Sequence, residues 1–76
     1  MARIIYRITP VSGMRSEWYV SRRGDADSLT QYWFSLVEKA KRLGVFHRQG
    51  RCKDGGLYFN IKYASGEERT FKFMKS

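Results

Sequence analysis

His47 and Cys52 are the only histidine and cysteine of the sequence, and they are the side chains best suited to nucleophilic or acid–base chemistry. Nucleophilic catalysis needs a nucleophile beside a positioned base. On one strand, a separation of five residues places two side chains on opposite faces unless a bulge, for example at Gly50, intervenes. One Cys and one His are also too few for a structural zinc site, which usually takes four such ligands. We therefore expect no Cys–His dyad, no bound metal or cofactor, and a protein that is not an enzyme.

The carboxylates form no catalytic or metal-binding pattern either. Asp25 and Asp27 resemble a fragment of a calcium loop, but the complete loop pattern does not follow them. Glu67 and Glu68 are adjacent, so on a strand their side chains point apart and make a poor catalytic pair. We assign Asp25 and Asp27 to the start of a helix instead.

One enzymatic alternative remains open, a small ribonuclease. Such an enzyme can act on an RNA phosphate with basic side chains, a tyrosine and one histidine, by electrostatic stabilisation and general acid–base catalysis. His47, with Arg51 and Tyr58 on the same predicted face, is the candidate for this chemistry. We rank this alternative below a plain surface histidine, because an acid–base role requires demonstrated geometry.

The charge balance is the strongest functional signal in the sequence. Fifteen Lys and Arg residues stand against seven Asp and Glu residues, which gives a net charge of +8. A field of this sign attracts polyanions, so we expect the partner to be nucleic acid, either RNA or DNA, or an acidic protein surface. The competing interpretation is that the charge serves only solubility.

Length and composition predict one compact domain over residues 1–76. The chain is 42% hydrophobic and 16% aromatic, which is enough for a core and unlike a disordered segment. A single cysteine excludes an intramolecular disulfide. No apolar run approaches the roughly 20 residues that span a bilayer, and the first ten residues have no signal-peptide core. We expect a cytoplasmic protein that makes no membrane contact.

Hydrophobic periodicity predicts two strands followed by a helix. Residues 3–9 and 16–23 read as strands joined by a long turn. The helix begins after Gly24, and Asp27 or Ser28 can cap it. Its apolar stripe runs from Leu29 to Leu43, and Gly44 fits the left-handed position just past its end.

Three further strands complete the predicted α+β fold, at residues 45–53, 57–63 and 69–74. The Asp54-Gly55 pair predicts a two-residue hairpin turn. A three-residue loop at 64–66 is expected next, because it pairs Phe59 with Phe71 across the last hairpin. The element order is ββαβββ, an antiparallel sheet of about five strands with one helix packed on one face. This differs from the αβββα order of double-stranded-RNA-binding domains, and the aromatic motifs of the RNA recognition motif are absent.

The sheet face without the helix must contact water or a partner. With the turns above, the side chains expected on this face in the last three strands are His47, Gln49, Arg51, Tyr58, Asn60, Lys62, Thr70 and Lys72. The first strand adds Arg3, Ile5 and Arg7, and the second adds Tyr19 and Arg23. This face is basic and carries aromatic rings.

We predict a small basic module that binds nucleic acid. Cations neutralise phosphates, and flat rings stack on unpaired bases. The Arg22-Arg23 pair joins the site because it precedes a helix N-terminus, where free N–H groups attract anions. No helix presents a row of base-reading side chains, so sequence specificity is not expected. The predicted binding residues are Arg3, Arg7, Tyr19, Arg22, Arg23, Arg51, Tyr58, Lys62 and Lys72.

The alternative is an inhibitor or adaptor that docks on a host protein or nucleoprotein complex, as small phage- or plasmid-type proteins do. Phe34 lies off the centre of the apolar stripe, with Tyr32 on the opposite flank, and either ring can anchor a protein partner. A symmetric homodimer through an edge strand or the open face is compatible with both functions.

Overall fold

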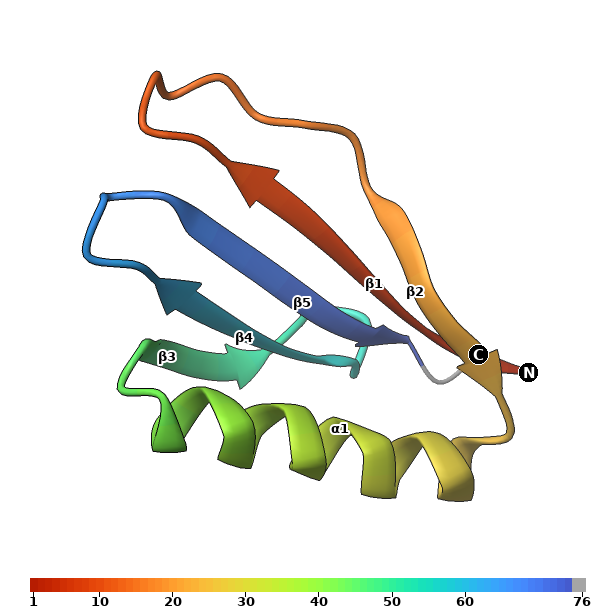
Figure 1. Ribbon diagram of the computed structural model, residues 1–76. Coiled ribbons are helices and arrows are strands. Elements are labelled where there is room, and N and C mark those ends of the chain that lie inside the picture. The colour runs from red at the N-terminus through yellow and green to blue at the C-terminus, as the bar shows by residue number, and fades with distance from the viewer. Residues whose placement is uncertain (75–76) are drawn as a thin grey trace.

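The strands form one antiparallel sheet in the order β2-β1-β5-β4-β3, and a single helix packs on one side of it (Figure 1). The computed structural model describes residues 1–74. This architecture confirms the predicted ββαβββ order and the α+β class. Within the described residues, no helix is both long enough and apolar enough to cross a membrane. The elements are β1 (Ala2–Thr9), β2 (Tyr19–Gly24), α1 (Ala26–Arg42), β3 (Phe46–Arg51), β4 (Leu57–Lys62) and β5 (Glu68–Met74).

Helix α1 is capped at both ends by local chemistry. The N-cap is Asp25, whose carboxylate accepts a hydrogen bond of 3.1 Å from the backbone N–H of Ser28. The prediction that Asp27 or Ser28 provides the cap was therefore wrong, because the helix starts at Ala26, two residues before the start that a cap at Asp27 requires. The bond from Ser28 lowers the pKa of the Asp25 carboxyl. At the other end Gly44 takes the predicted left-handed conformation, with φ of 74°.

The core lies between α1 and the sheet. Leu29, Trp33, Val37 and Ala40 of the helix are buried, as are the sheet residues Ala2, Ile4, Phe59, Ile61 and Phe73. The Trp33 ring centroid lies 4.9 Å from that of Phe59 in an edge-on arrangement. Contacts of this kind between aromatic rings add to the gain from burying their area. The predicted helix stripe is thus the face that packs on the sheet as far as Ala40. Leu43, the last residue predicted in the stripe, is exposed instead, because it lies beyond the last helical turn.

The hairpin of β4 and β5 has the predicted register. Phe59 lies opposite Phe71, and Leu57 lies opposite Phe73. The loop between the strands has three residues, since the backbone N–H of Tyr63 donates to the carbonyl of Glu67. Gly66 closes it with φ of 98°, a conformation that residues with a Cβ rarely adopt.

The hairpin of β3 and β4 differs from the prediction by one residue. Cys52 pairs with Gly56, so the loop is Lys53-Asp54-Gly55 and has three residues, not two. Two features stabilise it: the Gly56 N–H donates to the Asp54 side chain, and Gly55 has φ of 90°. A shift of one residue moves every side chain of a strand to the other face. Gln49 and Arg51 therefore lie on the helix side, opposite Phe59 and Leu57, contrary to the prediction.

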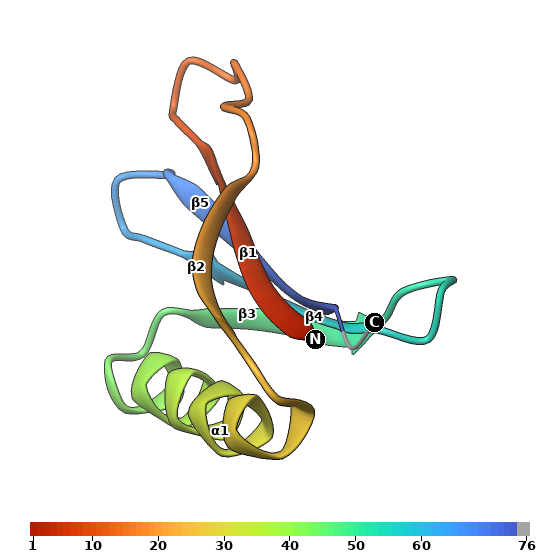
Figure 2. The same cartoon turned by 90° about the vertical axis from the view of Figure 1, so that its right-hand side faces the viewer.

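The two faces of the sheet are unequally covered. Figure 2 shows α1 lying along one side, while the loop end of the β1–β2 hairpin extends away from the helix. The opposite face carries no helix. Its side chains come from Arg7, Thr70, Asn60 and Arg48, which form one continuous row of register partners across β1, β5, β4 and β3.

Candidate nucleic-acid interface

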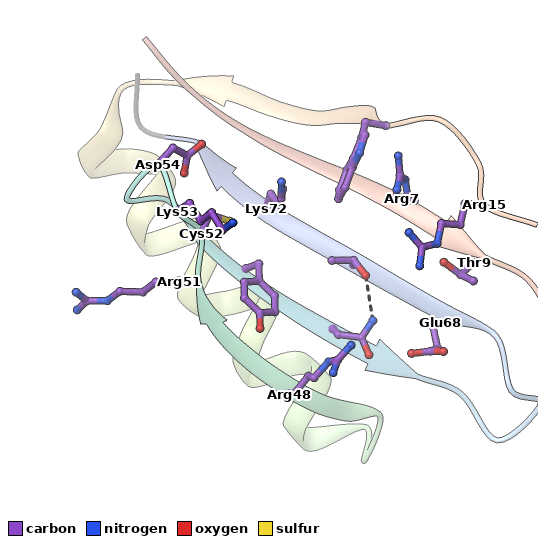
Figure 3. A pocket seen from close by; sticks show the side chains of 14 residues that line it. Arg7, Thr9, Arg15, Arg48, Arg51, Cys52, Lys53, Asp54, Glu68 and Lys72 are labelled. Atoms are coloured by element: carbon purple, nitrogen blue, oxygen red, sulfur yellow. Dashed lines mark hydrogen bonds between the residues drawn. The ribbon is translucent and has the colours of Figure 1, made fainter. Parts of the chain in front are cut away.

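The open face of the sheet is hollowed into a groove of about 680 Å³. Strands β1, β5, β4 and β3 form its floor (Figure 3). One end is bounded by Thr9, Arg15 and Glu68, and the other by the turn that contains Lys53 and Asp54. We call this hollow the sheet groove.

Positive charge dominates the sheet groove. Two carboxylates, Asp54 and Glu68, line it against six cations. Within residues 1–74 the ion pair of the structure joins Arg69 to Glu67, at 3.5 Å, and neither of these residues lines the groove. The groove cations thus repel one another without a paired carboxylate, an arrangement that a bound polyanion relieves. They are Arg7, Arg15, Arg48, Arg51, Lys53 and Lys72.

Trp18 lies over two of these cations. The guanidinium carbon of Arg7 is 4.6 Å from the centroid of the indole ring, and the ammonium nitrogen of Lys72 is 5.2 Å from it. The preceding loop holds the ring there, because the Ile8 N–H donates to the Ser16 hydroxyl and the Ser16 N–H donates to the Ile8 carbonyl. Trp18 is partly exposed, so an aromatic surface and two cations meet at one point of the groove.

Tyr58 provides a second ring, which packs against a glycine. Gly50 is its register partner on β3. A Cβ placed on Gly50 would lie 2.8 Å from Cε1 and 2.9 Å from the hydroxyl oxygen of Tyr58. The tyrosine ring therefore rests directly on the β3 backbone, which only a residue without a side chain permits.

A polar row with unused hydrogen-bonding capacity crosses the floor between the rings. Asn60 is 4% exposed, and its amide donates to the Thr70 hydroxyl (3.0 Å) and to the Arg69 carbonyl (3.2 Å). Among residues 1–74, its carbonyl oxygen, Oδ1, has no hydrogen-bond partner, and Nε of Arg7 has none either. Buried groups of this kind are costly to leave unpaired.

Four of the predicted binding residues line the sheet groove: Arg7, Arg51, Tyr58 and Lys72. Arg51 lies at the margin, and its side chain extends away from the groove in Figure 3. Three others belong to the open face but lie outside the groove. Arg3 and Arg23 are register partners at one end of the β1–β2 ladder, and Lys62 pairs with Glu68.

The remaining two predicted residues lie on the helix side of the sheet. The Tyr19 ring contacts Tyr6, at 5.6 Å between centroids, and Tyr6 contacts Phe71. The Arg22 guanidinium lies 4.4 Å over the ring of Tyr32 on the helix. The prediction that Tyr19 faces outward was wrong, because Tyr19 pairs with the inward Tyr6 and leaves Trp18 on the open face. His47 sits at an irregularity of the β3–β4 ladder and does not line the groove.

Sequence reasoning missed four cationic or aromatic residues of the groove: Arg15, Trp18, Arg48 and Lys53. Arg48 was missed because of the one-residue error in the β3–β4 loop, and Lys53 lies in that loop. Trp18 was missed because its neighbour Tyr19 was predicted to lie on the open face. The signal that points outward is the edge position of β2, which α1 does not cover at this end.

A second groove, of about 620 Å³, runs between α1 and the edge strand β3. Phe34 lines it and is 60% exposed, with Trp33 and Leu57 beside it. Tyr32, the other residue predicted to contact a protein, packs against the core and carries Arg22 on its ring. Phe34 and Tyr32 therefore do not form one patch.

Comparisons with known proteins identify no relative of the chain. No family model matches the chain, and no curated protein or solved structure matches it. Among residues 1–74, no three His, Cys, Asp or Glu side chains gather into a group that could hold a metal ion.

Proposed function

We propose that the protein binds single-stranded nucleic acid in the sheet groove. The observation that carries the proposal is the coincidence in one hollow of six cations without paired carboxylates and two aromatic rings, Trp18 and Tyr58. The cations hold backbone phosphates and release their counterions. The rings stack on bases, as in other grooves that bind single strands.

The aromatic rings favour a single strand over a duplex. In a duplex each base face is covered by its neighbours, so a ring on a sheet surface finds no base to stack on. In a single strand the base faces are free, and stacking contributes about 1–3 kcal/mol per base. Trp18 and Tyr58 offer this surface on either side of Lys72.

A pair of matched charge reversals tests the site. Arg48→Glu places a carboxylate in the groove, whereas Arg42→Glu makes the same change in the last turn of α1, outside the groove. Both arginines are exposed, so neither substitution disrupts the core. Fluorescence anisotropy with labelled single-stranded DNA and RNA, and with duplex DNA, measures the affinity of each variant.

The proposal predicts that Arg48→Glu weakens single-strand binding at least about fivefold at 0.1 M salt, the value expected when one phosphate contact is lost. Arg42→Glu should have a much smaller effect. Equal losses in the two variants would indicate attraction by net charge alone and would refute the groove as the site. Tighter binding to duplex than to single strands would refute the stacking role of the rings.

The second candidate function is protein docking at the groove between α1 and β3. The observation that favours it is the exposed Phe34 ring beside an edge strand, a combination that suits an added strand from a partner. Phe34→Ala should then abolish capture of the protein partner while leaving single-strand binding unchanged. Docking through this apolar contact should also resist salt, unlike phosphate binding.

A further inference from the structure

The polar row on the floor of the sheet groove has a fixed orientation. The Asn60 amide nitrogen faces the carbonyl oxygen of Arg69, which can only accept, so the side-chain nitrogen must lie on that side. The Asn60 carbonyl oxygen is then directed elsewhere, is buried, and accepts no hydrogen bond within the described residues. The groove therefore contains a buried acceptor that requires a donor from outside the chain.

Phosphate cannot supply that donor. Phosphate oxygens only accept hydrogen bonds, and the deoxyribose backbone has no N–H or O–H group within a strand. In a nucleic acid the available donors are the amino and imino groups of bases and the 2′-hydroxyl of ribose. The cations of the groove account for phosphate binding, but they leave Oδ1 of Asn60 unpaired.

The neighbours of Asn60 narrow the choice to a base edge. Tyr58 lies two residues away on the same face of β4, and Trp18 lies over Arg7 at the other end of the row. A base that stacks on either ring is held beside the row, so its N–H groups are the donors that this site brings close to Oδ1 of Asn60. The Thr70 hydroxyl oxygen already accepts from Asn60, so its hydrogen is free to donate. The floor thus presents an acceptor beside a donor.

We propose that the groove floor at Asn60 binds an N–H donor on the edge of an unpaired base, so that single-strand binding prefers bases that carry such a donor beside an acceptor. Adenine and cytosine present an amino donor beside a ring-nitrogen acceptor, and uracil and thymine present an imino donor beside a carbonyl acceptor, so each of them complements Asn60 and Thr70. A base analogue without that donor leaves Oδ1 of Asn60 unpaired. This inference rests on the proposed function and deepens it from phosphate binding to base preference.

The test uses the unmodified protein and base analogues. DNA oligomers of about eight nucleotides, within the usual site size, are compared in pairs. Deoxyadenosine is compared with purine 2′-deoxyriboside, which lacks only the amino group, and deoxyuridine is compared with N3-methyldeoxyuridine, in which a methyl group replaces the imino hydrogen. Loss of the donor should weaken binding about 3- to 10-fold in both pairs, the value of one neutral hydrogen bond. An RNA oligomer of matched sequence measures the contribution of the 2′-hydroxyl.

A protein variant assigns the preference to Asn60. Asn60→Leu keeps the branching and the number of side-chain heavy atoms and removes Oδ1, so the variant should bind the adenine and purine oligomers equally. Thermal unfolding confirms that the variant is folded, and the analogue comparison stands without it. Retention of the preference in a folded Asn60→Leu variant would place the contact elsewhere and overturn the inference.

Different results would overturn the base preference and the binding of nucleic acid. Salt-dependent binding with equal affinity for all four DNA oligomers would mean that Oδ1 meets only water, which overturns the base preference and leaves phosphate binding intact. Tighter binding to RNA without base preference would identify the 2′-hydroxyl as the donor and would also overturn it. No binding to any oligomer would overturn the proposed function, and the inference with it.

Discussion

Gly50→Ala tests the register that places Arg48, Gly50 and Tyr58 on the open face. The added methyl group would lie 2.8 Å from Cε1 of the Tyr58 ring, closer than carbon atoms pack, so the ring must move. Overpacking of this kind costs about 1–3 kcal/mol. The same substitution also gains about 0.5–1 kcal/mol of stability, because alanine loses less backbone entropy than glycine on folding into a strand. Gly50 does not have a positive φ, so no backbone strain adds to the sum.

The sign of the effect therefore depends on Tyr58. With the ring present, Gly50→Ala should destabilise the fold by roughly 0.5–2 kcal/mol, about 2–16 °C in Tm for a domain of this size. In a Tyr58→Ala background the same substitution should be neutral or stabilising. Thermal and urea unfolding of the four proteins gives the coupling energy, which should be about 1–3 kcal/mol.

The predicted two-residue turn gives the opposite expectation. In that register Gly50 faces the helix side and Arg51 lies opposite Tyr58. Gly50→Ala would then change stability by the same amount with or without the tyrosine ring. A coupling energy of zero would refute the register, and with it the position of Arg48 in the groove.

Two further predictions concern the loop ring and the helix cap. Trp18→Ala should weaken single-strand binding by about 1–3 kcal/mol, roughly 5- to 150-fold, in an anisotropy titration, whereas unchanged affinity would exclude stacking on Trp18. Asp25→Ala should lower the Tm at pH 7, and Asp25→Asn, which keeps an acceptor, should lower it less. Because the folded-state pKa of Asp25 is lowered, its contribution is present above its unfolded pKa and is lost as the pH falls below about 4. A Tm difference between wild type and Asp25→Ala that is as large at pH 2 as at pH 7 would contradict this assignment.

The sequence was sufficient for the elements with strong periodicity. The stripe from Leu29 to Ala40 defines both the helix and its buried face. The β4–β5 register followed from matching Phe59 with Phe71, since only one loop length buries both rings. In these elements, local preference and core packing favour the same arrangement.

The candidate site was predicted less well, because it depends on loops. The Asp54-Gly55 pair suits both a two-residue and a three-residue turn, and no large apolar pair on β3 distinguishes the two registers. The packing of Tyr58 on Gly50 favours the observed register over the predicted one, and this packing is a tertiary contact. Trp18 is placed by the bonds between Ser16 and Ile8, which span a loop whose path the sequence does not reveal.

The cations of the sheet groove are proposed to hold the phosphates of a single strand, and the salt dependence of binding is the sharpest test of this role. If the five groove cations other than Arg51 contact phosphates, the logarithm of the association constant should fall with the logarithm of salt concentration with a slope of about −3.5. Between about 50 and 200 mM salt the affinity should then fall roughly 130-fold. We expect a slope of about −3 to −4 that becomes shallower by about 1 in Arg48→Glu. A slope shallower than about −1, or one that Arg48→Glu leaves unchanged, would contradict it.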